Sequence, residues 1–167
     1  MADKHSYFAH LRLIIAILLL LGWILSGTIH EIGHLIVGKM AGLKLEFIQI
    51  IPPGVGFSGE TSRSWNAASS VSGMLCAVLV GLAGALAVVL LQAKWPYVRY
   101  AIWLFVPMMA QALVWFALSL VAVFVARIPD GDILKFTQQT EWPRFVVCLI
   151  GLVPVALCVA VLKRVWN

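Results

Sequence analysis

Three residues with ionisable side chains, His30, Glu31 and His34, follow the order H-E-x-x-H near the end of a long apolar run. Positions i and i+4 of a helix share one face, so both imidazoles could bind one Zn²⁺ ion while the glutamate handles a water molecule. Ionisable groups in a hydrocarbon layer are costly, and they mark functional sites by default. The motif therefore predicts a zinc hydrolase whose site lies inside a membrane.

The composition is that of an integral membrane protein. Of the 167 residues, 62% are hydrophobic and 11% are charged, and the mean hydropathy is +1.00. Each crossing needs about 20 apolar residues, so the chain has room for four or five spans and no soluble domain. The net charge of +5 includes no basic run, which argues against nucleic-acid binding and favours contact with the headgroups of a lipid bilayer.

Four long apolar segments predict an all-α membrane protein that forms a single domain over residues 1–167. The predicted transmembrane helices cover residues of about 11–40, 67–91, 97–126 and 145–165. Residues 43–66, after the first helix, begin with apolar and polar side chains in alternation and then enter a Pro/Gly turn. This pattern predicts a short β-hairpin or re-entrant loop. Non-helical backbone at membrane depth must be buried in protein or line a watery cavity. We therefore expect a cavity beside this segment.

A catalytic zinc site needs a third protein ligand and one open position. If the first helix ends on one side of the membrane, the link at 92–97 lies on the opposite side, and it contains no carboxylate. The link after the third helix returns to the side of the motif, and it contains Asp130 and Asp132. The spacing along the chain leaves both aspartates as candidate third ligands.

The chain resembles the site-2-protease family of intramembrane zinc metalloproteases. The similarity covers the first three helices and rests on three stretches of sequence. These are the HEIGH string at 30–34, residues 41–56, in which a glycine is followed by alternating residues and a Pro/Gly turn, and Asp130-Gly131. The third zinc ligand of this family is the Asp of a D-G pair at the end of a later helix. The resemblance therefore implies that Asp130 completes a shell with His30 and His34. Asp132 is the competing ligand, because it is only two residues from Asp130.

The same resemblance implies an activity and a location. It suggests a zinc metalloendopeptidase in which Glu31 is the catalytic acid–base group, and which hydrolyses a peptide bond within or near a transmembrane segment of a membrane protein substrate. We expect a multi-pass protein of a prokaryotic cell membrane. Six Lys and Arg residues on each side give no orientation by charge, and the substrate-binding residues and oligomeric state are not predicted.

One departure from the family pattern keeps other functions open. The family places an Asn, thought to hold the substrate carbonyl, before the Asp, but residues 122–127 contain no Asn. Gln111 is the only carboxamide inside the third predicted helix, where it could substitute or could instead form an inter-helix hydrogen bond. A catalytically inactive protease-like scaffold is therefore an alternative. A metal-ion transporter is less favoured, because the second and fourth helices offer no ionisable residue within their apolar lengths.

Overall fold

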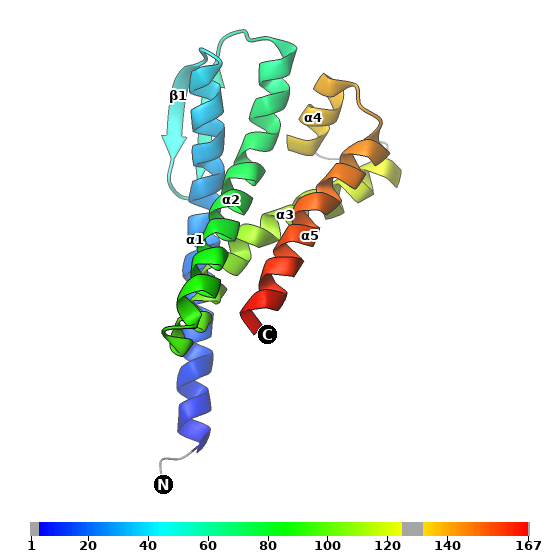
Figure 1. The fold of residues 1–167 in the computed structure, drawn as a ribbon. Coiled ribbons are helices and arrows are strands. Elements are labelled where there is room, and N and C mark those ends of the chain that lie inside the picture. Colours follow the sequence, from blue (N-terminus) through cyan, green and yellow to red (C-terminus); the bar gives the residue numbers. More distant parts are fainter. Residues whose placement is uncertain (1–3, 125–131, 167) are drawn as a thin grey trace.

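Four helices in the computed structural model, which describes residues 4–124 and 132–166, are long and apolar enough to cross a membrane (Figure 1). They are α1 (Lys4–Met40), α2 (Arg63–Gln92), α3 (Ile102–Phe124) with the preceding 3-10 helix η1 (Pro96–Ala101), and α5 (Arg144–Trp166). The predicted all-helical fold with four candidate spans is confirmed. This arrangement is consistent with a multi-pass membrane protein.

The helix boundaries depend on local capping. Helix α2 begins at Arg63, earlier than the predicted start at Ala67, because the Ser62 side chain accepts a hydrogen bond from the Trp65 N–H at 3.4 Å. A serine in this position satisfies a backbone donor that would otherwise lack a partner in the first turn. The third span starts as η1 with Pro96 in its first turn, where proline removes no intrahelical hydrogen bond.

The predicted hairpin after α1 is present. Strands β1 (Lys44–Gln49) and β2 (Gly54–Ser58) pair in antiparallel fashion, and Pro53 in the connecting turn packs against Gly27 of α1. Because Gly27 precedes the HExxH motif, the hairpin folds back along α1 past the motif, as Figure 1 shows. Ile51 at the tip of the hairpin is 87% exposed, and lipid can cover this apolar side chain.

Helix α2 lies at the centre and contacts all of the other helices. Small residues recur every four positions in this helix, at Gly73, Ala77, Gly81 and Ala85, and they permit a close approach of neighbouring helices. A Cβ atom at Gly81 would lie 2.9 Å from Met108 Cβ of α3. On the α1 side, Gly33 lies directly against the backbone carbonyl of Ser72. The buried cluster around α2 contains Met74, Val78, Ala85, Val88, Ile102, Met109, Ala112 and Trp115.

The polar link at 127–143 contains a helix that we did not predict, α4 (Asp132–Thr140). Its side chains separate into two faces: Ile133 is buried in the core and Phe136 packs against the core, whereas Lys135 is exposed. At its far end the Arg63 guanidinium of α2 donates to the Glu141 carboxylate at 2.7 Å. Tertiary contacts therefore hold this short helix in place, since isolated helices of this length are marginal in water.

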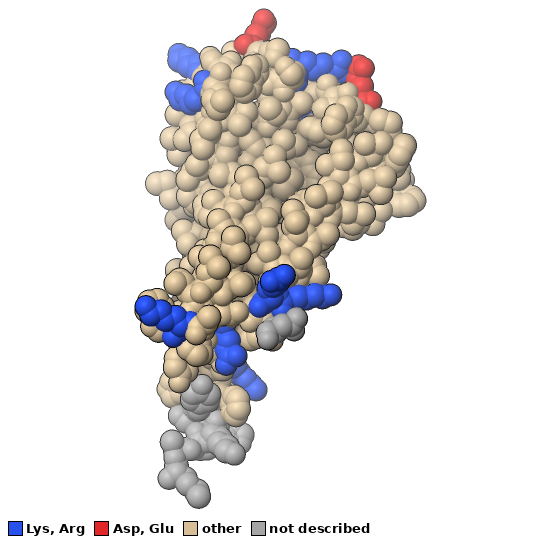
Figure 2. All heavy atoms as spheres, in the orientation of Figure 1, with Lys and Arg blue, Asp and Glu red and all other residues tan. Residues whose placement is uncertain are grey.

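The charged side chains gather at two levels of the molecule. Figure 2 shows Lys and Arg near both ends, with a broad band of other residues between them. Lys39 lies in the last turn of α1, while Lys163 and Arg164 lie in the last turn of α5, at the opposite level. Two charged belts separated by an apolar band are the pattern expected of helices that cross a bilayer.

Candidate metal centre

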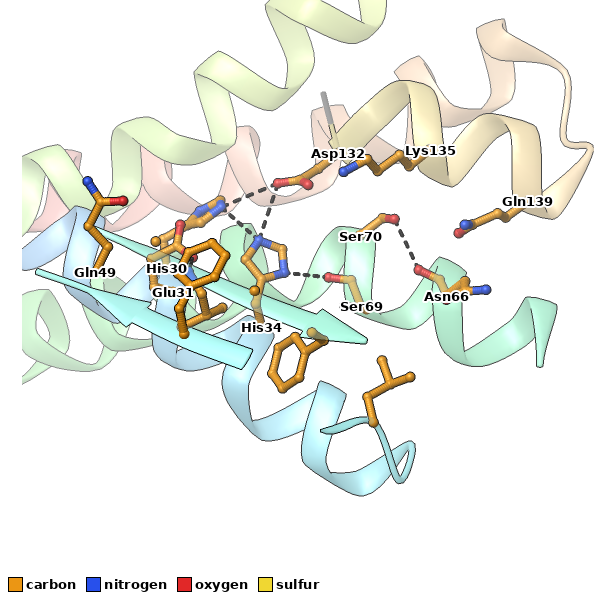
Figure 3. Close-up of a pocket in the computed structure, with 16 residues that line it drawn as sticks. His30, Glu31, His34, Gln49, Asn66, Ser69, Ser70, Asp132, Lys135 and Gln139 are labelled. Atoms are coloured by element: carbon orange, nitrogen blue, oxygen red, sulfur yellow. Dashed lines mark hydrogen bonds and ion pairs between the residues drawn. The ribbon is translucent and has the colours of Figure 1, made fainter. Parts of the chain in front are cut away.

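Three side chains converge where α1 faces the start of α4. The Nε2 atoms of His30 and His34 are 3.1 Å apart, and Asp132 Oδ2 lies 3.4 Å and 3.3 Å from them, respectively (Figure 3). The two histidines are one turn apart in α1, so the helix itself places both rings on one face. Asp132 is the first residue of α4. Two elements far apart in the sequence therefore supply three candidate ligand atoms.

The hydrogen bonds around these side chains leave the lone pairs of the three candidate ligand atoms directed at one another. His34 Nδ1 lies 2.7 Å from the Ser69 carbonyl of α2 and donates to it, which leaves Nε2 as the ring's acceptor. His30 Nδ1 is buried and has no hydrogen-bond partner among the described residues. Electron-rich atoms at 3.1–3.4 Å repel one another unless a proton or a metal ion lies between them.

Asp132 is ionised at neutral pH. Burial raises the pKa of its carboxyl group. When protons rather than a metal ion lie between these atoms, hydrogen bonds from His30 and His34 to the carboxylate outweigh this effect and hold the pKa well below its usual range. A ligating carboxylate must be deprotonated, and a ligating histidine must be neutral. The protonation state of Asp132 therefore suits a ligand.

Strand β2 orients Glu31. The Val55 N–H donates to Glu31 Oε2 at 3.0 Å, so this edge of β2 faces the histidines. One carboxylate oxygen of Glu31 and one ring nitrogen each of His30 and His34 lie within 4.8 Å of one another, an arrangement that could hold a metal ion. A carboxylate at this distance can also reach a bound ligand through one water molecule.

A cavity of about 640 Å³ opens beside this cluster, as expected for the space next to the hairpin. Helices α1, α2 and α4 and both strands line it. Besides His30, Glu31, His34 and Asp132, its polar lining residues are Gln49, Asn66, Ser69, Ser70, Lys135 and Gln139 (Figure 3). Water and a polar ligand could therefore reach a group that otherwise sits among apolar helices.

Gly73 of α2 is a part of the site that sequence reasoning missed. A Cβ atom at this position would lie 2.5 Å from His30 Nε2 and 2.6 Å from His34 Nε2. Only glycine leaves this space to the two imidazoles. The signal in the sequence was the repeat of small residues every four positions, but a repeat cannot show which of its members faces a ligand.

We expect Gly73→Ala to reduce metal affinity at least about tenfold, because the added methyl group must displace both ligand nitrogens. Zn²⁺ affinity, measured by competition with a chelator, checks this prediction. Gly81→Ala is the matched control: it adds the same methyl group against Met108, so it should lower the melting temperature and leave the metal affinity unchanged. Wild-type affinity in Gly73→Ala would contradict the geometry.

The structure brings together His30, Glu31 and His34, as predicted. Asp130 lies outside the described residues, so the preference for it stays a prediction. Asp132, the competing residue, is the one whose carboxylate reaches both imidazoles.

Gln111 lies elsewhere. Its Nε2 donates to Ser26 Oγ of α1 at 3.1 Å, and Ser26 Oγ donates to the Pro107 carbonyl of α3 at 3.3 Å. The inter-helix hydrogen bond considered for Gln111 is therefore confirmed. Gln111 does not line the cavity.

Comparisons of the chain with protein-family models, with curated proteins and with solved structures found no match. The likeness to site-2 proteases therefore stays an expectation from the sequence motifs. Since fold alone does not determine function, the function must be argued from the geometry of the site.

Proposed function

We propose that this protein is an intramembrane zinc metalloprotease that hydrolyses a peptide bond within or near a transmembrane segment of a membrane protein substrate. The triangle of His30 Nε2, His34 Nε2 and Asp132 Oδ2 carries this proposal. A tetrahedral zinc ion has bonds of about 2.0–2.2 Å to nitrogen and oxygen, which places its ligand atoms about 3.3 Å apart. The edges of the triangle, 3.1, 3.3 and 3.4 Å, fit three corners of that tetrahedron.

The donor set also suits catalytic zinc. Two imidazoles and a carboxylate leave the fourth position open, as in zinc hydrolases with three protein ligands, whereas structural zinc sites are closed by four. When bound, the ion lowers the pKa of its water toward about 7 and polarises the substrate carbonyl. His34 supports this role through its Ser69 partner, because a ligating histidine typically donates its other ring N–H to a carbonyl or carboxylate.

Glu31 is the proposed general base. It removes a proton from the water molecule whose oxygen bonds to the scissile carbonyl carbon. As the C–N bond breaks, Glu31 returns the proton to the leaving amine. The Val55 N–H binds Oε2 and so holds the carboxylate beside the histidines throughout.

The hairpin supports the presentation of an extended peptide. The edge of β2 that carries the Val55 N–H faces Glu31, and residues of both strands line the cavity. An extended substrate segment can add to such an edge through main-chain hydrogen bonds. A transmembrane helix shields its own amides, so it must unwind before its backbone can be attacked. The hairpin stabilises the unwound form.

Metal removal tests the proposal. We expect the purified protein to bind about one Zn²⁺ per chain and to cleave an internally quenched peptide that contains an apolar segment of about 20 residues interrupted by a Gly-Pro pair. Treatment with 1,10-phenanthroline should abolish cleavage, and added Zn²⁺ should restore it. Protein without affinity for zinc would refute the proposal. A zinc-loaded protein that binds the peptide without cleaving it would instead support the inactive scaffold.

A further inference from the structure

Lys135 of α4 is the only Lys or Arg among the described residues that line the cavity. We propose that its ammonium group binds the negatively charged oxygen that forms on the scissile carbonyl during hydrolysis. This inference rests on the proposed protease function and adds a catalytic residue that neither the motif nor the family resemblance suggests.

The orientation of α4 brings Lys135 to the cavity. Asp132, Lys135 and Gln139 are at positions i, i+3 and i+7, so they share one helix face, and all three line the cavity. Ile133 lies on the opposite face, where it is buried. Figure 3 shows the Lys135 side chain extended towards the carboxylate of Asp132.

Of the two side chains of α4 that line the cavity beyond Asp132, Lys135 lies nearer to this ligand along the helix than Gln139 does. It follows the ligand Asp132 by three residues, which is about 4.5 Å along the helix axis. Gln139 is seven residues from Asp132, and Asn66 is seven residues from Gly73, which contacts the two imidazoles; each is therefore about 10 Å away along its helix. The stem of a lysine is long and flexible enough to follow a reacting atom.

The carboxamides of Gln49 and Gln111 are engaged elsewhere. Gln49 Nε2 donates to the Ile51 carbonyl in the hairpin turn at 3.2 Å, and Gln111 Nε2 donates to Ser26 Oγ between α1 and α3. Lys135 takes part in none of the ion pairs among the described residues. Since no described carboxylate pairs with it, its ammonium group can bind an anion that forms in the cavity.

The hydrolysis forms one C–O bond and breaks one C–N bond. As the oxygen of the water molecule bonds to the carbonyl carbon, the π electron pair moves onto the carbonyl oxygen, and the Lys135 ammonium donates a hydrogen bond to this oxyanion. When the C–N bond breaks, the pair returns to form the carboxyl product, and the amine leaves with the proton from Glu31. A donor placed where charge develops lowers the barrier, because it binds the oxyanion more tightly than it binds the neutral carbonyl of the substrate.

Lys135→Met tests the inference in the zinc-loaded protein with the quenched peptide. We expect kcat to fall on the order of 100-fold, which is the usual cost of losing one oxyanion donor, while KM and zinc content stay within about twofold of wild type. Lys135→Arg should restore most of the rate because it keeps the charge. Lys39→Met is the matched control: it removes an exposed lysine that does not line the cavity, and it should leave both constants unchanged.

A second measurement does not depend on turnover. A peptide phosphonate carries negative oxygens at the position of the scissile carbonyl, and its affinity for the zinc-loaded protein should fall at least about tenfold in Lys135→Met. Unchanged kcat and phosphonate affinity would overturn the inference. A rise in KM alone would overturn it too, since Lys135 would then bind an acidic group of the substrate, and loss of zinc would show a structural role. If the wild type binds zinc but does not cleave, the proposed protease function fails, and the phosphonate affinities still decide the role of Lys135.

Discussion

Glu31→Gln is expected to lower cleavage of the quenched peptide by at least about 1,000-fold and to leave zinc bound. A carboxamide cannot accept the proton of the attacking water, and general base catalysis contributes about 10²–10⁴-fold. The glutamine oxygen can still accept the hydrogen bond that the Val55 N–H now donates to Glu31 Oε2. The hairpin and the two histidines should therefore keep their positions. Single-turnover cleavage and zinc content, measured on the same preparation, check both halves of this expectation.

Glu60→Gln is the matched control for that variant, because Glu60 is an exposed loop glutamate outside the cavity lining. It should cleave at the wild-type rate. If Glu31→Gln also cleaves at the wild-type rate, another group activates the water and the proposed mechanism is wrong. If it loses zinc, Glu31 acts as a ligand of the metal.

Asp132→Ala should weaken zinc binding by at least about 100-fold. It removes one of the three atoms that form the triangle with His30 Nε2 and His34 Nε2, and even residues that only orient a ligand change metal affinity about 10- to 100-fold. Chelator competition measures the affinity. Far-UV circular dichroism should show the wild-type helix content, since buried Ile133 and the packing of Phe136 against the core keep α4 in place.

Asp130→Ala is the internal control for Asp132→Ala. The motif comparison favours Asp130 as the third ligand, whereas the described geometry favours Asp132, and the two single variants separate these alternatives directly. Zinc loss in Asp130→Ala alone would restore the ligand set expected from the sequence. Zinc loss in Asp132→Ala alone would support the geometry of the triangle.

The spans and the hairpin could be predicted because their signals are local. A crossing of the bilayer requires only enough consecutive apolar residues, and a strand requires only period-two alternation near a turn. Helix α4 could not be predicted in the same way, since its nine residues depend for their position on the packing of Ile133 and Phe136 against residues far apart in the chain.

By itself the sequence determined that His30 and His34 share a helix face with Glu31 beside them, because that spacing is a property of one helix. It also predicts that Asp130 and Asp132 lie on the same side of the membrane as the motif, because the side of each link depends only on the number of spans before it. Only the tertiary structure brought Asp132 and Gly73 to the imidazoles and Lys135 into the lining of the cavity beside them. These contacts depend on how α1, α2 and α4 are rotated and crossed, and this is set by packing between residues far apart in the chain.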